Sequence, residues 1–450
     1  MEQAPWLTGL ASANTLDVED ATQQCVKIQE CMNASETLDR SSTAATQVDA
    51  QAAALSAGAV QRLLGLQHAL HKSLVLHMEQ APTPLSLPPP PAPPSPLPAS
   101  DLPCATSAVN VPAQLLGAAR ATQRALSACI MDGNVSGHTK GRNVEAKQEF
   151  ALLGGISAST ALLSASLQLV AVTRAAAGSP LHSTACHTAA DCAWTLCWAT
   201  RWDSEASGRV AQALECGVVP ALVVTLNAWQ DMLPAAAAAA YLISNIVYRN
   251  GAATAAVMKW RGASALVSAL EGMAGEEGVP GLTLASNAAS ALGNLTNTFP
   301  QQGPFEERHR TVLAAGAVGW LVALGTAHTG SPQQRALMVL SNLSQSDFAL
   351  EALHEHGAPG LFVRVVEQWA ASASSDSTPY AVVKAVMGLA FMFGRELECD
   401  ADTSSVSSGS GGDQRRRVRE LLVDVKAVDL IVDQLARCLA GEKWLGTSAE

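Results

Sequence analysis

The sequence predicts an all-α solenoid built from three-helix repeats. With 450 residues the chain exceeds the size at which a single compact core stops growing, so it forms either two domains or an elongated array. Hydrophobic residues make up 48% and aromatic residues only 4%. The apolar share is mostly Ala, Leu and Val, which favours close-packed helices over a sheet. A helical pattern also recurs from about residue 58 to the C-terminus, which indicates the array.

The shortest copy of this pattern is segment 332–369. It reads PQQRALMVLSNLSQSDFALEALHEHGAPGLFVRVVEQW. A proline opens an apolar helix that carries Ala336, Leu340 and Asn342, a short helix follows, and Gly357 precedes a second apolar helix. Each repeat is therefore expected to contain a short first helix, a glycine turn, a second helix and a longer third helix.

A glycine stands before each predicted second helix. These positions are Gly58, Gly155, Gly217, Gly262, Gly316 and Gly357, with Lys426 at the equivalent place in the last unit. A sharp change of direction between two helices needs backbone angles that glycine adopts without a Cβ penalty. We therefore interpret the glycines as the turns between first and second helices.

Three further positions recur in the predicted third helices. A proline marks the first turn, where its missing N–H has no intrahelical partner. A small residue later in the helix allows close approach of neighbouring helices, and a Leu-type residue follows as core. The prolines are Pro112, Pro180, Pro234, Pro280, Pro332 and Pro379, the small residues Cys192, Ala239, Ala288, Ala336 and Ala385, and the core residues Leu196, Ile243, Leu292, Leu340 and Leu389.

The recurring positions give a domain division. It comprises an N-terminal helical cap (1–44), a repeat array of about six repeats plus a truncated seventh (45–440), a proline-rich linker inserted in the first repeat (82–103), a Ser/Gly-rich flexible loop (400–414) and a C-terminal tail (441–450). The linker is too rich in proline for a helix or a central strand. It is either a spacer or a ligand for a polyproline-binding domain.

The repeat pattern resembles the armadillo repeat family, most clearly over residues 143–393. The resemblance implies a right-handed superhelix whose third helices line a concave groove, with an Asn on each holding the backbone of an extended peptide. Carried over by position, these residues are Asn245, Asn294 and Asn342. An amide side chain offers a donor and an acceptor, which suits an extended strand. The alternative is that each Asn binds a neighbouring backbone carbonyl and fixes the stacking of the helices.

Five neighbouring side chains are the expected source of specificity in this groove. Trp194 and Trp198 lie on one helix face, and with Tyr241 on the next helix they would form an aromatic patch. Ordinary core packing is the alternative for these rings. Arg249 and Met338 complete the predicted set.

Within the family, the importin-α type of nuclear import adaptor is the closest subfamily, and this chain departs from it. That groove has a Trp four residues before each Asn, where this sequence has Tyr241, Ser290 and Met338. The N-terminal 45 residues are acidic, where the subfamily carries a basic importin-β-binding segment. The third helices also contain few acidic residues for lysine side chains. A nuclear import adaptor is therefore kept as the alternative function.

Composition and motifs limit the other function classes. A net charge of −11 without a basic face argues against a nucleic-acid binder, and no apolar run long enough to cross a bilayer lacks polar breaks. The chain shows no phosphate-binding loop, no nucleophile elbow and no metal-binding HExxH helix. The cysteines of segment 182–202 read as small core residues. We expect a non-enzymatic scaffold, monomeric and cytoplasmic or nuclear, with no cofactor or metal, whose partner is a protein or an extended peptide.

Overall fold

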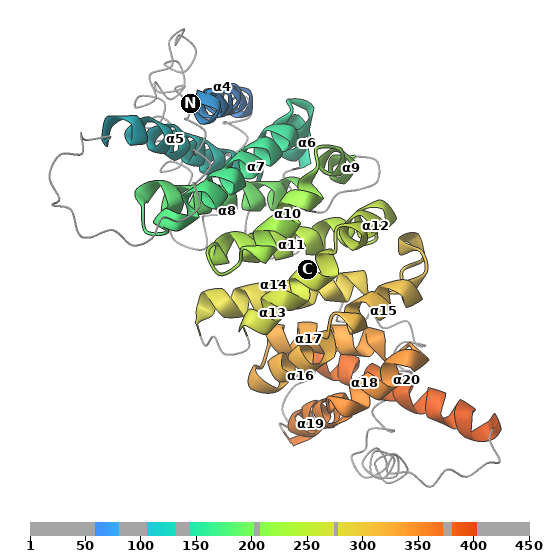
Figure 1. Ribbon diagram of the computed structural model, residues 1–450. Coiled ribbons are helices and arrows are strands. Elements are labelled where there is room, and N and C mark those ends of the chain that lie inside the picture. Colours follow the sequence, from blue (N-terminus) through green and yellow to red (C-terminus); the bar gives the residue numbers. More distant parts are fainter. Residues whose placement is uncertain are drawn as a thin grey trace, which may run out of the picture. The chain divides into compact units, whose positions relative to one another are not determined.

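The computed structural model describes residues 59–80, 106–131, 144–201, 208–273, 278–371 and 380–402 (Figure 1). Within these residues all regular secondary structure is helical. The predicted N-terminal cap, the proline-rich linker, the truncated seventh repeat and the C-terminal tail lie outside the described residues, as does most of the Ser/Gly-rich loop. Those parts of the domain division stay predictions.

The helices follow the predicted order of first, second and third helix. The first helices are α6 (Val144–Leu152), α9 (Arg209–Glu215), α12 (Gly251–Lys259), α15 (Phe305–Ala314) and α18 (Asp347–Glu355). The second helices are α4 (Ala59–Gln80), α7 (Gly155–Thr173), α10 (Val218–Asn227), α13 (Gly262–Met273), α16 (Ala317–Ala327) and α19 (Ala358–Ala371). The third helices are α5 (Thr106–Ile130), α8 (Pro180–Thr200), α11 (Leu233–Val247), α14 (Val279–Leu295), α17 (Ser331–Leu343) and α20 (Tyr380–Asp402). Two short 3₁₀ helices, η1 (Arg174–Ala176) and η2 (Pro300–Gln302), lie in connections.

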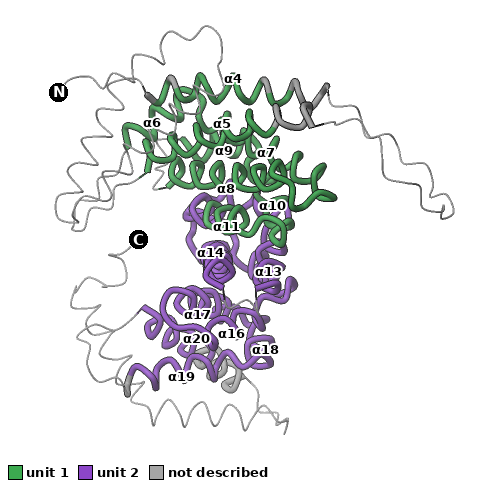
Figure 2. The backbone as a smooth tube through the Cα atoms, turned by 90° about the vertical axis from the view of Figure 1, so that its left-hand side faces the viewer, with its two compact units in different colours: residues 1–242 green, residues 243–450 purple. Residues whose placement is uncertain are grey.

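The chain divides into two compact units, residues 1–242 and 243–450, at a point within α11 (Figure 2). In unit 1, third helix α5 packs against third helix α8, and second helices α4 and α10 both pack against α7. In unit 2, third helices α14, α17 and α20 pack in succession, as do second helices α13, α16 and α19. Because each class of helix packs on its own class in the next repeat, the described helices form an all-α solenoid.

The predicted small residues of the third helices are core residues. Cys192, Ala239, Ala288, Ala336 and Ala385 are all 0% exposed. The Leu-type positions that follow them are also buried. Small side chains at these points let neighbouring third helices approach closely, which confirms the interpretation of this position.

The prolines mostly open third helices as predicted. Pro180 is the first residue of α8, and the preceding Ser179 hydroxyl accepts a hydrogen bond from the backbone N–H of His182. Pro234, Pro280 and Pro332 lie in the first turns of α11, α14 and α17, while Pro379 lies outside the described residues. The prediction for Pro112 is wrong, because α5 begins at Thr106 and continues through this proline.

The turns between first and second helices have a left-handed residue, as the glycines predicted. Gly217, Gly316 and Gly357 have φ of 76°, 80° and 78°. At the other two turns the left-handed residue lies one position before the predicted glycine, at Gly154 with φ 79° and Arg261 with φ 59°. Arg261 therefore adopts a conformation that is unfavourable for a residue with a Cβ atom.

The predicted glycines at those two turns have another role. A Cβ atom at Gly155 would collide with the ring of Phe150, and one at Gly262 would collide with the side chain of Val257. Both neighbours lie on the preceding first helix. Glycine is therefore required here because the two helices approach closely, and not because of its backbone angles.

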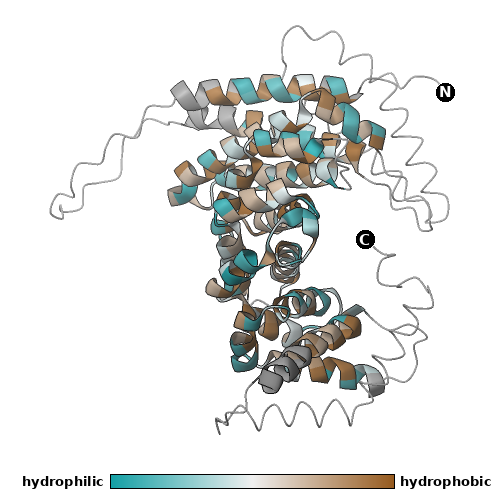
Figure 3. Ribbon diagram, turned by 90° about the vertical axis from the view of Figure 1, so that its right-hand side faces the viewer, coloured by the Kyte–Doolittle hydropathy of each residue, from teal (hydrophilic) through white to brown (hydrophobic). Residues whose placement is uncertain are grey.

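We expected no membrane span, but one described helix is long and apolar enough to cross a membrane. Segment Gly155–Ala176, which comprises α7 and η1, has 22 residues and a mean hydropathy of 1.5, enough to cross a membrane by length and composition. The described residues contain up to 3 candidate membrane spans if each of two bent helix pairs is counted as one span. However, 67% of the apolar window of this helix is buried within the fold, where α7 packs against α4, α8 and α10. Most helices in Figure 3 likewise carry both hydrophobic and hydrophilic residues.

Candidate functional site

The C-terminal half of third helix α8 reaches solvent along a single stripe. From Thr188 to Thr200 every residue is buried except Asp191, Trp194 and Trp198, which are half-buried. Their spacing of three and four residues places them on one side of the helix. Two tryptophans thus occupy the open side of a helix segment that is otherwise buried.

The positions equivalent to Trp194 and Trp198 on the following third helices are also mostly half-buried. On α11 the half-buried residues of this stripe are Tyr241 and Asn245, and on α14 they are Ser290 and Asn294. On α17 Met338 is half-buried, whereas Asn342 is only 5% exposed. We define the unit 1 face as Arg120, Arg124, Asp191, Trp194, Trp198 and Tyr241, and the unit 2 face as Asn245, Ser290, Asn294 and Met338.

The three predicted aromatic residues lie together on the unit 1 face. The ring centroids of Trp194 and Trp198 are 6.5 Å apart with an interplanar angle of 27°, and those of Trp194 and Tyr241 are 5.6 Å apart. The Arg201 guanidinium lies 5.3 Å from the Trp198 ring centroid, within cation–π distance. The rings therefore form a continuous aromatic surface that is still partly open to solvent.

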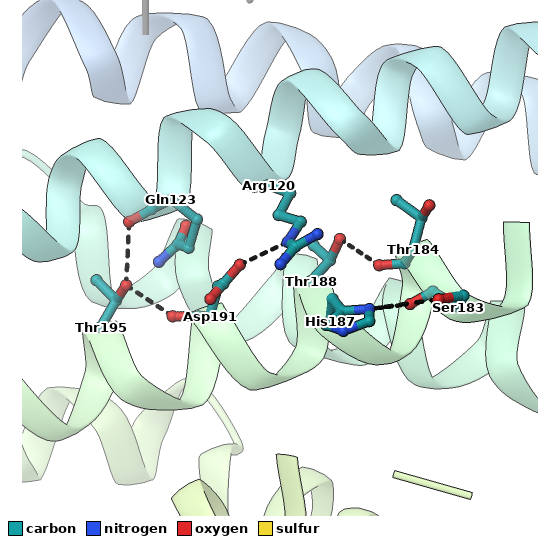
Figure 4. Close-up of polar contacts among 8 residues, drawn as sticks. All are labelled: Arg120, Gln123, Ser183, Thr184, His187, Thr188, Asp191 and Thr195. Carbon is teal, nitrogen blue, oxygen red and sulfur yellow. Dashed lines mark hydrogen bonds and ion pairs between the residues drawn. The ribbon is translucent and has the colours of Figure 1, made fainter. Parts of the chain in front are cut away.

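Two arginines of α5 border this aromatic surface. Arg120 Nε donates to Asp191 Oδ2 at 2.9 Å (Figure 4). In the same figure the Thr195 hydroxyl donates to the Gln123 carbonyl oxygen at 3.3 Å. The Arg124 side chain is exposed one helical turn beyond Arg120, and its charge acts on the Asp191 carboxylate.

The Asp191 carboxylate is already engaged within this face. Its burial raises its pKa, and the Arg120 hydrogen bond and the charges of Arg120, Arg124 and His187 oppose that rise. The side chains of Arg120 and Asp191 are 34% and 21% exposed, so solvent screens part of their attraction. The ion pair mainly fixes the two side chains in place and satisfies the acidic group of the face.

The predicted asparagines of unit 2 bind the neighbouring third helix. Asn294 Nδ2 donates to the Ser244 carbonyl oxygen at 2.9 Å and to its hydroxyl at 3.0 Å. Asn342 Nδ2 donates to the Gly293 carbonyl oxygen at 3.0 Å. These are the hydrogen bonds of the stacking alternative. Asn245 differs, because its Nδ2 is buried without a hydrogen-bond partner among the described residues.

Arg249 and Met338, the remaining predicted specificity residues, belong to unit 2. Arg249 follows α11 with φ 55°, and its guanidinium lies 4.8 Å from the Phe299 ring centroid and 5.2 Å from that of Tyr248. Met338 covers Gly293, where an added Cβ atom would collide with its methyl group. The structure leaves the peptide-binding roles of both residues as predictions.

A buried polar cluster follows α14 and was not predicted. Arg308 is 4% exposed, and its guanidinium lies within hydrogen-bond distance of five backbone carbonyl oxygens. These belong to Leu295, Asn297, Gln302, Gly303 and Pro304. The guanidinium thus satisfies free carbonyls at the end of α14 and in the connection to α15.

His309 extends this cluster to the next repeat. It is 0% exposed, and its Nε2 lies 2.7 Å from the Thr296 carbonyl oxygen. Because a carbonyl only accepts, Nε2 carries the hydrogen and Nδ1 accepts from the Ser346 hydroxyl at 2.7 Å. Burial lowers the pKa of His309, which favours this neutral form.

The cysteines of segment 182–202 behave as packing residues. Cys192 and Cys197 are 0% exposed, and burial raises the pKa of both thiols well above the usual value. Cys186 lines a cavity of about 240 Å³ with His182, His187 and Asp231. Among the described residues no group of three or more potential metal ligands is present.

Comparison with known proteins gives likenesses in structure alone. No protein-family model and no curated protein matches the sequence. A designed armadillo repeat protein is 18% identical, with a TM-score of 0.45, over 61% of this chain and 93% of its own. Another, solved in complex with the peptide (KR)4, is 17% identical, with a TM-score of 0.43, over 61% and 93%. An engineered protein is 17% identical, with a TM-score of 0.43, over 94% and 98%.

The chain has an armadillo-like helical fold. This assignment rests on the order of the helix triplets and on the stacking of each helix class described above. At TM-scores below 0.5 the likenesses add no argument about the ligand.

Proposed function

We propose that this chain is a non-enzymatic protein-binding scaffold, and that the unit 1 face recognises an extended peptide or a surface of a partner protein. The observation that supports this proposal most strongly is the stripe on α8. The α8 residues between and flanking the two tryptophans in sequence are buried, yet Trp194 and Trp198 remain half-open and stack on each other. Large aromatic side chains held on a rigid helix are typical anchors of protein interfaces.

The side chains of the aromatic surface are also pre-organised, because their mutual contacts hold them in place without a partner. The two tryptophans lie on one helix, and the Trp194 ring also contacts Tyr241. A partner that covers these rings removes apolar area from water and orders few side chains in return. Both effects favour association.

A catalytic function has less support. The cavity lined by His182, Cys186, His187 and Asp231 brings several titratable groups together. Burial and the nearby Asp231 charge raise the pKa of the Cys186 thiol, which opposes formation of the reactive thiolate. The proposal therefore includes no reaction.

The nuclear import alternative depends on the sequence resemblance alone. A receptor for lysine-rich signals needs acidic groups on its binding face, whereas the unit 1 face presents Arg120 and Arg124, and Asp191 already binds Arg120. A cytoplasmic or nuclear location is part of the proposal, and imaging of the fluorescently tagged full chain in cells tests it.

Affinity capture from cell extract tests the proposed function. The full chain, the Trp194→Ala/Trp198→Ala variant and the control Trp260→Ala serve as baits, with quantitative mass spectrometry as readout. Trp260 is 49% exposed and follows first helix α12, so its truncation removes the same side chain from another surface.

We expect a set of proteins that the wild type and Trp260→Ala capture equally and that the double variant loses. Circular dichroism confirms that the double variant keeps its helix content. Capture that the double variant leaves unchanged would contradict the proposed function. Importin-β or proteins with basic signals in the lost set would favour the import alternative.

A further inference from the structure

We infer that the unit 1 face takes an extended, acidic, proline-containing segment of a partner protein. This inference rests on the proposed function and names the chemical class of its ligand. It combines two features that lie side by side on the face: the aromatic surface of Trp194, Trp198 and Tyr241, and the arginines beside it.

The aromatic feature favours proline. A prolyl ring has no side-chain freedom to lose and packs on aromatic rings through its apolar face. A proline-rich segment is also pre-organised as an extended helix without internal hydrogen bonds, so that binding orders it at low entropic cost. The half-buried rings of Trp194 and Trp198, 6.5 Å apart, present such a surface along one helix.

The charge of the face favours a carboxylate. Helices α5 and α11 contain no acidic residue, and Asp191 is the acidic residue of α8. Arg120 engages Asp191, Arg124 is exposed one helical turn further along α5, and Arg201 lies over Trp198. These third helices therefore carry local positive charge in a chain whose net charge is −11.

A guanidinium beside an aromatic surface suits this ligand, because the rings can pack against proline while the guanidinium binds a carboxylate. Arginine binds a carboxylate through paired N–H donors and remains charged at every physiological pH. A basic segment would instead meet Arg124 and Arg201 without a free acidic partner on the described third helices of this unit. The sign of the charge thus separates this inference from recognition of a lysine-rich signal.

Fluorescence anisotropy with the full chain tests the inference. Four labelled peptides of equal length contain Glu and Pro, Gln and Pro, Lys and Pro, or Glu and Ala. We expect the Glu/Pro peptide to bind most tightly and the Lys/Pro peptide roughly tenfold more weakly. Raising the salt concentration should reduce this difference, because salt screens exposed charges. Residues 82–103 are present throughout, so any competition from this proline-rich segment is constant.

Two pairs of variants assign the effect to the face. Arg124→Glu should reverse the preference between Glu/Pro and Lys/Pro, whereas the control Arg364→Glu, at an exposed position of second helix α19, should not. Trp198→Ala should weaken all three proline peptides, whereas Trp260→Ala should not. Circular dichroism of each variant confirms folding before binding is measured.

The outcomes separate this inference from the proposed function. A Lys/Pro peptide that binds as tightly as Glu/Pro, but still depends on Trp198, would overturn the acidic ligand and keep the binding face. Equal binding of Glu/Pro and Glu/Ala would overturn the role of proline. Peptide affinities that neither Arg124→Glu nor Trp198→Ala changes would overturn the inference, as would the absence of binding by any peptide. In either case, capture from extract decides whether the face binds another ligand.

Discussion

The two faces use the same positions of the repeat for different purposes. In unit 1 the stripe residues Trp194 and Trp198 remain half-open and stack on each other. In unit 2 the equivalent amides of Asn294 and Asn342 donate to backbone carbonyls of the preceding third helix. The same position therefore holds a half-open ring in unit 1 and an amide that joins neighbouring helices in unit 2.

The difference shows which part of a repeat is free to vary. Buried small residues such as Cys192 and Ala288 set the approach of the third helices in both units, and both are 0% exposed. In unit 1 the half-open rings of the stripe are less constrained than these buried residues, whereas in unit 2 the stripe amides also join the helices. An asparagine on the stripe is thus no sign of a ligand by itself, because a backbone carbonyl on the neighbouring helix satisfies it equally well.

The largest predicted effect comes from the buried polar contacts of unit 2. Arg308→Ala removes a charged donor and leaves buried carbonyls without partners. We expect the free energy of opening the α14–α15 connection to fall by about 3 kcal/mol. Hydrogen–deuterium exchange should show faster exchange in α14 and α15 and unchanged exchange in α5 and α8.

Arg310→Ala is the matched control for this variant. Arg310 is exposed, and its guanidinium lies 4.7 Å from the ring centroid of Phe348. We expect its truncation to change stability by less than about 1 kcal/mol. Similar exchange in the two variants would show that the carbonyl contacts of Arg308 contribute little.

A smaller effect is expected from the amide on the next third helix. Asn342→Ala removes the amide donor of the Gly293 carbonyl, which keeps only the longer hydrogen bond of 3.2 Å from the Thr296 hydroxyl. We expect the free energy of unfolding to fall by about 1–2 kcal/mol. The control Asn227→Ala removes an exposed amide at the end of α10 and should change little. Denaturant unfolding measures both. A fully stable Asn342→Ala variant that no longer binds partners would instead return this residue to the binding face.

The smallest predicted effect is the gain in stability when glycine replaces either arginine that has left-handed backbone angles. Arg261→Gly should raise the free energy of unfolding by about 0.5–1 kcal/mol, because glycine adopts this conformation without strain. Arg249→Gly should raise it less, because Arg249 also loses its contacts with Phe299 and Tyr248. Equal gains in thermal denaturation would mean that these ring contacts contribute nothing.

Repeat periodicity was sufficient to predict the helix triplets. The buried small residues and the prolines at Pro180, Pro234, Pro280 and Pro332 report directly on helix packing and helix starts. The helix start predicted at Pro112 is wrong, because a proline also occurs inside a helix when the surrounding contacts outweigh its lost hydrogen bond. The glycine pattern located the described turns to within one residue, since close approach and left-handed angles both select glycine, while Gly58 and Lys426 lie outside the described residues.

The site was predicted only in part. Aromatic residues at helical spacing indicated the contact of Trp194, Trp198 and Tyr241. The arginines of α5 were missed because α5 was not aligned with the later third helices, although Arg120 and Arg124 have the same four-residue spacing as Trp194 and Trp198. Arg308 could not be predicted, because the carbonyls that it binds become neighbours only when α14 and its connection fold.

Photo-crosslinking at the unit 1 face tests the central claim most directly. Benzoylphenylalanine replaces His187, which is exposed at one end of the α8 stripe, or Trp260 as the control position. We predict covalent adducts with partner proteins at position 187 that Trp194→Ala/Trp198→Ala abolishes, and none of these adducts at position 260. The same adducts at both positions, or adducts at 187 that the double variant leaves intact, would contradict recognition by this face.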